Sequence, residues 1–199
     1  MNKYIPNLLT LLRLIAIPFF VILSLGNRSI AALFVFVFAC ITDYFDGMIA
    51  RKYNVISNFG KLMDPLADKT LVLAALVLLA IPTISYIHWS VVLIIAFREI
   101  AVSVLRQRYL KKNIVIAANI WGKIKTVVQM TGIITALVLF AAFKMNIFEF
   151  LMPYQNGLIF SIRCYFWITA LITMLSGMNY FMVKAEELNP HLTQKKKNE

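Results

Sequence analysis

Long apolar runs alternate with short polar segments along this chain. Divided at charged residues and at Gly or Pro breaks, it contains six runs close to the roughly 20 residues that a helix needs to cross a bilayer. Each run is continuous, whereas the strands of a membrane barrel would alternate apolar and polar residues. The pattern predicts an all-α, polytopic membrane protein, a bundle of six transmembrane helices over residues 5–26, 29–50, 63–82, 84–106, 122–143 and 157–183.

Composition and length agree with one membrane domain followed by a tail. Hydrophobic residues make up 61% of the 199 residues, above the about 45–50% of an ordinary soluble domain. We therefore expect residues 1–183 to form the six-helix domain, and residues 184–199 to form a polar, basic C-terminal tail.

The four aspartates of the chain all lie between residues 43 and 68, across the predicted turn between the second and third helices. A charged side chain at the bilayer centre costs about 2.5–3.5 kcal/mol on insertion scales, so clustered acids need a partner such as a cation. Residues three or four apart share a helix face, so Asp43 projects with Asp46, and Asp64 with Asp68. Carboxylates from two antiparallel helices suit one or two ions of Mg²⁺ or Mn²⁺, which often complete their shells with phosphate oxygens.

Two other interpretations of these acids stay open at this point. Asp64 before Pro65 is typical of a helix N-cap and first helical residue, which would explain one aspartate of the four. A cation transporter also carries intramembrane acids, but it would favour carboxylates spread through the membrane depth. Here they gather at one level beside many basic residues.

Basic loop residues predict the orientation, because Lys and Arg concentrate in cytoplasmic loops. Loops 51–61 and 106–113 and the tail are rich in them, whereas the opposite loops carry little more than Arg28 and Lys144. We expect a multi-pass protein of the cell membrane with both termini and the aspartates facing the cytosol. The net charge of +11 then reflects topology and attraction to anionic membrane lipids. Nucleic-acid binding is the weaker interpretation, and we expect none.

Residues 43–68 follow the pattern Asp43-x2-Asp46-Gly47-x2-Ala50-Arg51-x8-Gly60-x3-Asp64-x3-Asp68. This pattern resembles the CDP-alcohol phosphatidyltransferase family, since it matches every fixed position of the family signature. Three further segments resemble the branch of the family whose acceptor is sn-glycerol 3-phosphate: Asn7-x2-Thr10-x2-Arg13, Phe97-Arg98-Glu99 and Trp121-Gly122-Lys123-x-Lys125-Thr126.

The resemblance implies an enzyme that transfers the phosphatidyl group of CDP-diacylglycerol to sn-glycerol 3-phosphate and releases CMP. A sibling enzyme with phosphatidylglycerol, serine or inositol phosphate as acceptor is the alternative. The resemblance also implies a homodimer.

The resemblance assigns roles to particular residues. Asp43, Asp46, Asp64 and Asp68 would hold Mg²⁺ or Mn²⁺, and Asp68 would also be the general base. The small residues Gly47 and Ala50 leave room for a nucleotide near the backbone, and Arg51 can bind phosphate in bidentate geometry. The expected nucleotide contacts are Asn7, Thr10, Gly47, Ala50 and Arg51. The expected contacts to the acceptor phosphate are Arg98, Arg106, Lys123 and Lys125.

Overall fold

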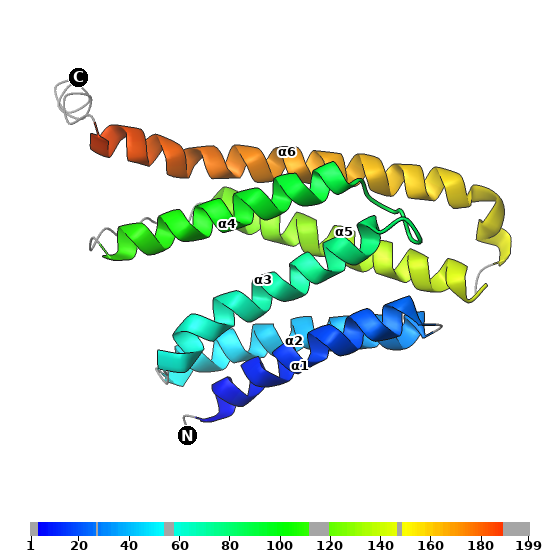
Figure 1. Ribbon diagram of the computed structural model, residues 1–199, viewed down its shortest axis with the longest axis horizontal. Coiled ribbons are helices and arrows are strands. Elements are labelled where there is room, and N and C mark those ends of the chain that lie inside the picture. The colour runs from blue at the N-terminus through cyan, green and yellow to red at the C-terminus, as the bar shows by residue number, and fades with distance from the viewer. Residues whose placement is uncertain (1–3, 27, 54–57, 112–119, 147–148, 189–199) are drawn as a thin grey trace.

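The computed structural model describes residues 4–26, 28–53, 58–111, 120–146 and 149–188 (Figure 1). These residues form helices and turns and include no strand, which confirms the all-α prediction. The elements are α1 (Tyr4–Leu25), α2 (Ser29–Tyr53), α3 (Asn58–Ala80), α4 (Trp89–Lys111), α5 (Ile120–Lys144), the short 3-10 helix η1 (Glu149–Tyr154) and α6 (Gln155–Leu188).

Each predicted span overlaps one α-helix, but two starting points differ from the expectation. α3 begins at Asn58, a residue type favoured at helix starts, so Asp64 lies inside the helix. The interpretation of Asp64 as an N-cap is therefore wrong. α4 begins at Trp89 rather than at residue 84, because Pro82 cannot continue the backbone hydrogen bonds of α3 and residues 81–88 form a turn.

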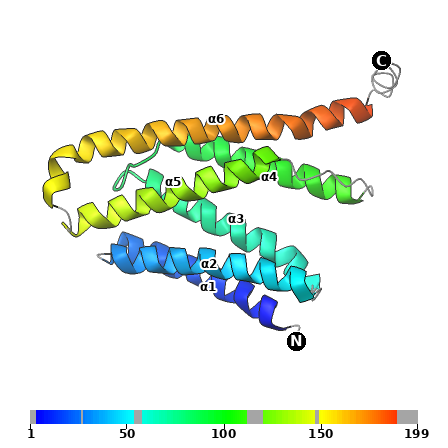
Figure 2. The same cartoon turned by 180° about the vertical axis from the view of Figure 1, so that it is seen from behind.

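The helices pack as two groups. α1 packs against α2 and α3, while α6 packs against α4 and α5, and the pairs α2–α5, α3–α4 and α3–α5 join the groups. The start of α1, the end of α2, the start of α3 and the ends of α4 and α6 lie at the same end of the bundle (Figures 1 and 2). We call this end, which carries the aspartates, the aspartate end. α2 and α3 converge there and diverge toward the opposite end.

Small and aromatic residues fill the interior. Ala39, Ala75 and Ala136 are fully buried, and small residues let helix backbones approach closely. The rings of Phe20 and Phe36 pack with their centroids 5.3 Å apart and join α1 to α2. The core therefore runs through both groups of helices.

Large apolar side chains also cover the outside of the bundle, as in Phe34 at 70% exposure, Phe97 at 74% and Leu171 at 62%. Exposed apolar surface of this extent is typical of contact with lipid or protein. Within the described residues, Ile124–Lys144 and Glu149–Gly177 are long and apolar enough to cross a membrane, judged by length and composition. That all six α-helices cross a membrane stays a prediction.

The end opposite the aspartates is held by basic side chains that bind backbone carbonyls. Lys144 Nζ, at the end of α5, donates to the carbonyl oxygens of Ser24 at 3.2 Å and Gly26 at 2.5 Å. Arg163 Nη2 of α6 donates to the carbonyl oxygen of Ser85 at 2.7 Å. These bonds satisfy carbonyls at a helix end and in a turn. The Lys144 bonds hold α5 against the end of α1, and the Arg163 bond holds α6 against the turn after α3.

α5 and α6 meet closely at Gly132. A Cβ atom added there would lie 2.6 Å from Tyr165 Cε1 and 3.3 Å from Phe166 Cζ. The Tyr165 ring is held in place, because its hydroxyl donates to the carbonyl oxygen of Val128 at 2.8 Å and lies 2.9 Å from Thr131 Oγ1. Even a methyl group at residue 132 therefore requires α6 to shift or the ring to lose these bonds.

We predict that Gly132→Ala destabilises the protein by about 1–3 kcal/mol, the usual cost of an overpacked core. Gly157→Ala is the matched control, since a Cβ there meets nothing within 4 Å, and alanine favours helix over glycine by up to about 1 kcal/mol. Thermal unfolding in detergent should show a lower midpoint for Gly132→Ala than for Gly157→Ala. Equal midpoints for the two variants would contradict close packing at Gly132.

Candidate functional site

The aspartates occupy the converging ends of two helices. Asp43 and Asp46 belong to the second half of α2, and Asp64 and Asp68 belong to the first half of α3. Among the side chains that the structure describes, no three His, Cys, Asp or Glu residues gather as a metal site. Of the four aspartates, only the side chain of Asp43 belongs to that described part. The predicted roles of six more residues also concern atoms outside it and stay predictions: Asn7, Gly47, Ala50, Arg51, Arg106 and Lys123.

Asp43 pairs with a buried arginine of the neighbouring helix. Arg13 of α1 has no exposed side-chain surface, and its Nη1 lies 2.6 Å from Asp43 Oδ1, while the Asp43 side chain keeps 42% exposure. A guanidinium buried among helices needs such a partner, because removal from water is costly. Thr10, the predicted nucleotide contact, is also fully buried, one turn before Arg13. The ion pair fixes Asp43 at the surface of α2 and leaves its carboxylate accessible.

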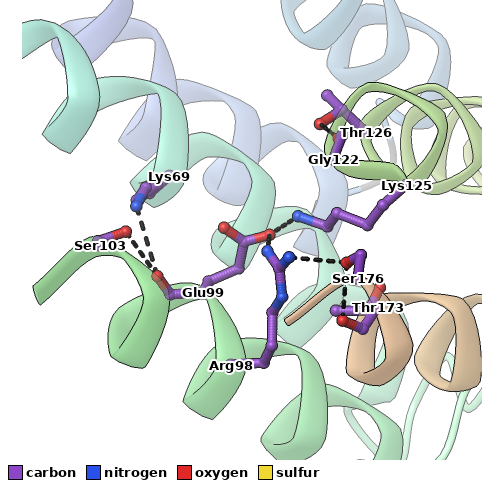
Figure 3. Close-up of polar contacts among 9 residues, drawn as sticks. All are labelled: Lys69, Arg98, Glu99, Ser103, Gly122, Lys125, Thr126, Thr173 and Ser176. Atoms are coloured by element: carbon purple, nitrogen blue, oxygen red, sulfur yellow. Dashed lines mark hydrogen bonds and ion pairs between the residues drawn. The ribbon is translucent and has the colours of Figure 1, made fainter. Parts of the chain in front are cut away.

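A second charged cluster lies where α3, α4 and α5 meet, and Figure 3 shows it. Glu99 of α4 forms an ion pair with Lys125 of α5 through Oε1. The backbone carbonyl of Glu99 accepts a hydrogen bond from Ser103 Oγ at 2.6 Å and a longer one from Lys69 Nζ of α3 at 3.5 Å. Glu99 therefore connects three helices. Lys125 is only 6% exposed, so its charge is compensated inside the protein.

Arg98 points toward α6. It is 8% exposed, and its Nη2 donates to Ser176 Oγ at 2.7 Å. Gly177 lets the side chain approach, since a Cβ there would lie 3.2 Å from Arg98 Nε and 3.3 Å from Arg98 Cγ. Arg98 Nη1 lies 3.9 Å from Glu99 Oε1. Arg98 thus packs α4 against α6 and approaches the Glu99 carboxylate.

A small pocket opens beside this cluster, with about 70 Å³ of space for water-sized groups. Lys69 follows Asp68 directly in α3, so one residue of the pocket wall is the sequence neighbour of the last aspartate. Of the residues predicted to bind the acceptor phosphate, Lys125 lines the pocket and Arg98 does not. Its lining consists of Lys69, Val72, Leu73, Glu99, Lys125, Thr126, Gln129 and Met130.

The charges of the lining make the pocket suitable for an anion. Its charged lining residues are two lysines, Lys69 and Lys125, and one carboxylate, Glu99, so cationic side chains outnumber anionic ones there. The sequence prediction did not select Lys69 or Gln129. The sequence contains one indication that Gln129 belongs to the site: it lies four residues after Lys125, and residues four apart share a helix face.

Known proteins resemble this chain over most of its length. The family model described as CDP-alcohol phosphatidyltransferase matches residues 3–175. A Bacillus subtilis protein named CDP-diacylglycerol–glycerol-3-phosphate 3-phosphatidyltransferase is 36% identical, over 92% of this chain and 96% of that protein. A Rickettsia prowazekii protein of the same name is 35% identical, over 90% and 94% respectively. A Mycobacterium tuberculosis protein named probable phosphatidylglycerophosphate synthase is 42% identical, over 65% and 63%.

We predict that the Arg13–Asp43 pair stabilises the helix packing. Arg13→Leu should lower the free energy of unfolding by about 1–3 kcal/mol, less than the roughly 3–5 kcal/mol of a fully buried pair, because Asp43 is partly exposed. Arg13→Lys keeps the charge and should lose less. A double-mutant cycle with Asp43→Asn, measured by thermal unfolding, isolates the pair. Strictly additive effects of the two substitutions would mean that the pair contributes nothing.

Proposed function

Because this chain belongs to the CDP-alcohol phosphatidyltransferase family, we propose that the aspartate end of its bundle is the active site. The enzyme transfers the phosphatidyl group of CDP-diacylglycerol to sn-glycerol 3-phosphate, which gives phosphatidylglycerophosphate and CMP. One observation carries the location of the site. The family pattern from Asp43 to Asp68 spans the converging ends of α2 and α3, directly before the pocket residue Lys69.

The family uses a divalent metal ion, and the donors of this chain fit one. Carboxylates are the ligands that Mg²⁺ and Mn²⁺ prefer, and four of them lie on two converging helices. The carboxylate of Asp43 stays accessible beside Arg13. We assign Asp43, Asp46, Asp64 and Asp68 to hold one or two ions. A bound ion would neutralise charge on the pyrophosphate and on the departing CMP.

The chemical step transfers one phosphoryl centre between two oxygens. A hydroxyl oxygen of glycerol 3-phosphate attacks the phosphorus that carries diacylglycerol, and Asp68 accepts the hydroxyl proton. A new phosphorus–oxygen bond forms, while the bond from this phosphorus to the CMP oxygen breaks and CMP leaves with the electron pair. Gly47, Ala50 and Arg51 contact the cytidine nucleotide, with Asn7 on α1 as a further contact.

The acceptor phosphate binds among the basic residues near the pocket. Lys125 is our first assignment, because it lines the pocket and is held by Glu99. Arg98 adds a second positive charge near the Glu99 carboxylate and is held by Ser176 of α6. Arg106, late in α4, and Lys123, early in α5, belong to the same end of the bundle and complete the basic set.

The substrate explains the membrane setting. CDP-diacylglycerol carries two acyl chains and a charged nucleotide, so its enzyme has to work at the boundary between lipid and water. We propose a multi-pass protein of the cell membrane that works as a homodimer, with both termini and the active site in the cytosol. The apolar outer faces of the helices support the membrane placement, and the basic loops support the orientation.

We predict CMP release that depends on both glycerol 3-phosphate and a divalent cation. Purified protein should release CMP from CDP-diacylglycerol with Mg²⁺ or Mn²⁺, lose the activity in EDTA, and release far less with serine, inositol phosphate or phosphatidylglycerol. Asp68→Asn should lower turnover at least about 100-fold, the usual scale for a general base, while CMP still binds. Release with another acceptor would overturn the assigned substrate. Full activity of Asp68→Asn would remove Asp68 from the mechanism.

We predict separate effects for the two described basic residues. Lys125→Met should raise the KM for glycerol 3-phosphate by roughly 10–100-fold, the equivalent of one lost charged hydrogen bond. Arg98→Ala should raise this KM by a smaller factor and also lower the midpoint of thermal unfolding, because its bond to Ser176 joins two helices. Steady-state kinetics and melting curves of both variants test this. If neither variant changes the KM, the acceptor phosphate binds elsewhere.

A further inference from the structure

Gln129 carries a buried amide that no described residue satisfies. It lies on α5 one turn after Lys125, lines the same pocket, and is only 2% exposed. Within the described residues, neither its Oε1 nor its Nε2 has a hydrogen-bond partner. Buried side-chain amides are nearly always hydrogen-bonded, and an unpaired one is unfavourable. An unpaired amide in a pocket wall therefore indicates a polar group of a ligand.

The other lining groups narrow the chemistry of this ligand. Lys69 and Lys125 favour an anionic group, and Glu99 already pairs with Lys125. The Thr126 hydroxyl donates to the Gly122 carbonyl at 3.0 Å, so its proton is engaged within α5. Val72, Leu73 and Met130 supply an apolar wall. Among the described wall residues, the unpaired polar group is the Gln129 amide. It can donate one hydrogen bond and accept another, and so can the hydroxyl group of a ligand.

We propose that Gln129 is a specificity-determining residue that binds a non-reacting hydroxyl of a polyol phosphate acceptor. This inference rests on the proposed function. Glycerol 3-phosphate has two hydroxyl groups, of which one attacks phosphorus and the other keeps its proton. The second hydroxyl donates to Gln129 Oε1 and accepts from Gln129 Nε2, while its phosphate lies toward the lysines. A site that hydrogen-bonds a substrate hydroxyl discriminates strongly against an analogue without it, because the buried amide is then left unpaired.

The test compares two acceptors that differ by one hydroxyl. 3-Hydroxypropyl phosphate keeps the phosphate and the terminal hydroxyl of glycerol 3-phosphate and lacks the middle one. The wild-type kcat/KM for glycerol 3-phosphate should exceed that for the analogue by at least about tenfold. The analogue is also measured as a competitive inhibitor against glycerol 3-phosphate, so that slow turnover still yields a ratio of affinities.

Variants at residue 129 should remove this discrimination. Gln129→Met keeps the length of the side chain but cannot replace the amide bonds. It should lower kcat/KM for glycerol 3-phosphate about 10–100-fold and leave the value for the analogue within about threefold. Gln129→Glu keeps an acceptor oxygen and should retain part of the ratio, which covers the case in which the Met variant does not fold. Val127→Met is the control variant, because Val127 of α5 is 62% exposed, and it should leave the ratio unchanged.

Each outcome separates this inference from the function on which it rests. A wild-type ratio near one overturns the role of Gln129 without any variant. An equal loss for both acceptors in Gln129→Met overturns it as well, since a merely structural role predicts that result. No CMP release by the wild-type protein with glycerol 3-phosphate contradicts the proposed function instead.

Discussion

Charged side chains buried between apolar helices have to be neutralised, and this constraint organises one half of the bundle. Arg13 and Asp43 neutralise each other between α1 and α2. Glu99 and Lys125 do so between α4 and α5, and the Glu99 backbone also binds Lys69 of α3. Burying an unpaired charge costs several kcal/mol, so each pair fixes the relative position of its helices. The opposite end carries bonds from Lys144 and Arg163 to backbone carbonyls instead.

The same two pairs border the chemistry that we propose. Arg13 pairs with Asp43, the first aspartate of the family pattern. Lys69, which lines the pocket, directly follows the last aspartate, Asp68, in α3. A substrate with a lipid tail and a charged head requires polar groups at one level of an otherwise apolar bundle. The ion pairs make that level stable in the protein, while the carboxylate of Asp43 stays accessible and two lysines, Lys69 and Lys125, line the pocket.

Much of this account could be predicted from the sequence, because apolar runs and fixed motif spacings are local signals. The runs located all of the described α-helices, and the pattern from Asp43 to Asp68 indicated the family. Local signals failed where packing decides. The start of α4 depends on the turn after Pro82, and Asp64 lies inside α3 although its neighbour Pro65 is typical of a helix start. Glu99 pairs with Lys125 of another helix and approaches its neighbour Arg98, and the burial of Gln129 is visible only after α3, α4 and α5 are packed together.

In the proposed active site, the aspartates hold a metal ion beside the pocket that receives the acceptor. Electron–nuclear hyperfine spectroscopy of bound Mn²⁺ tests it directly, in a complex with CMP and ¹³C-labelled glycerol 3-phosphate that cannot turn over. We predict Mn²⁺ bound to the wild-type protein, with resolved coupling to ³¹P and to ¹³C of the acceptor, and loss of the bound ion in Asp43→Asn or Asp64→Asn. Mn²⁺ that stays bound in both variants, or that shows no coupling to the acceptor, would contradict the claim.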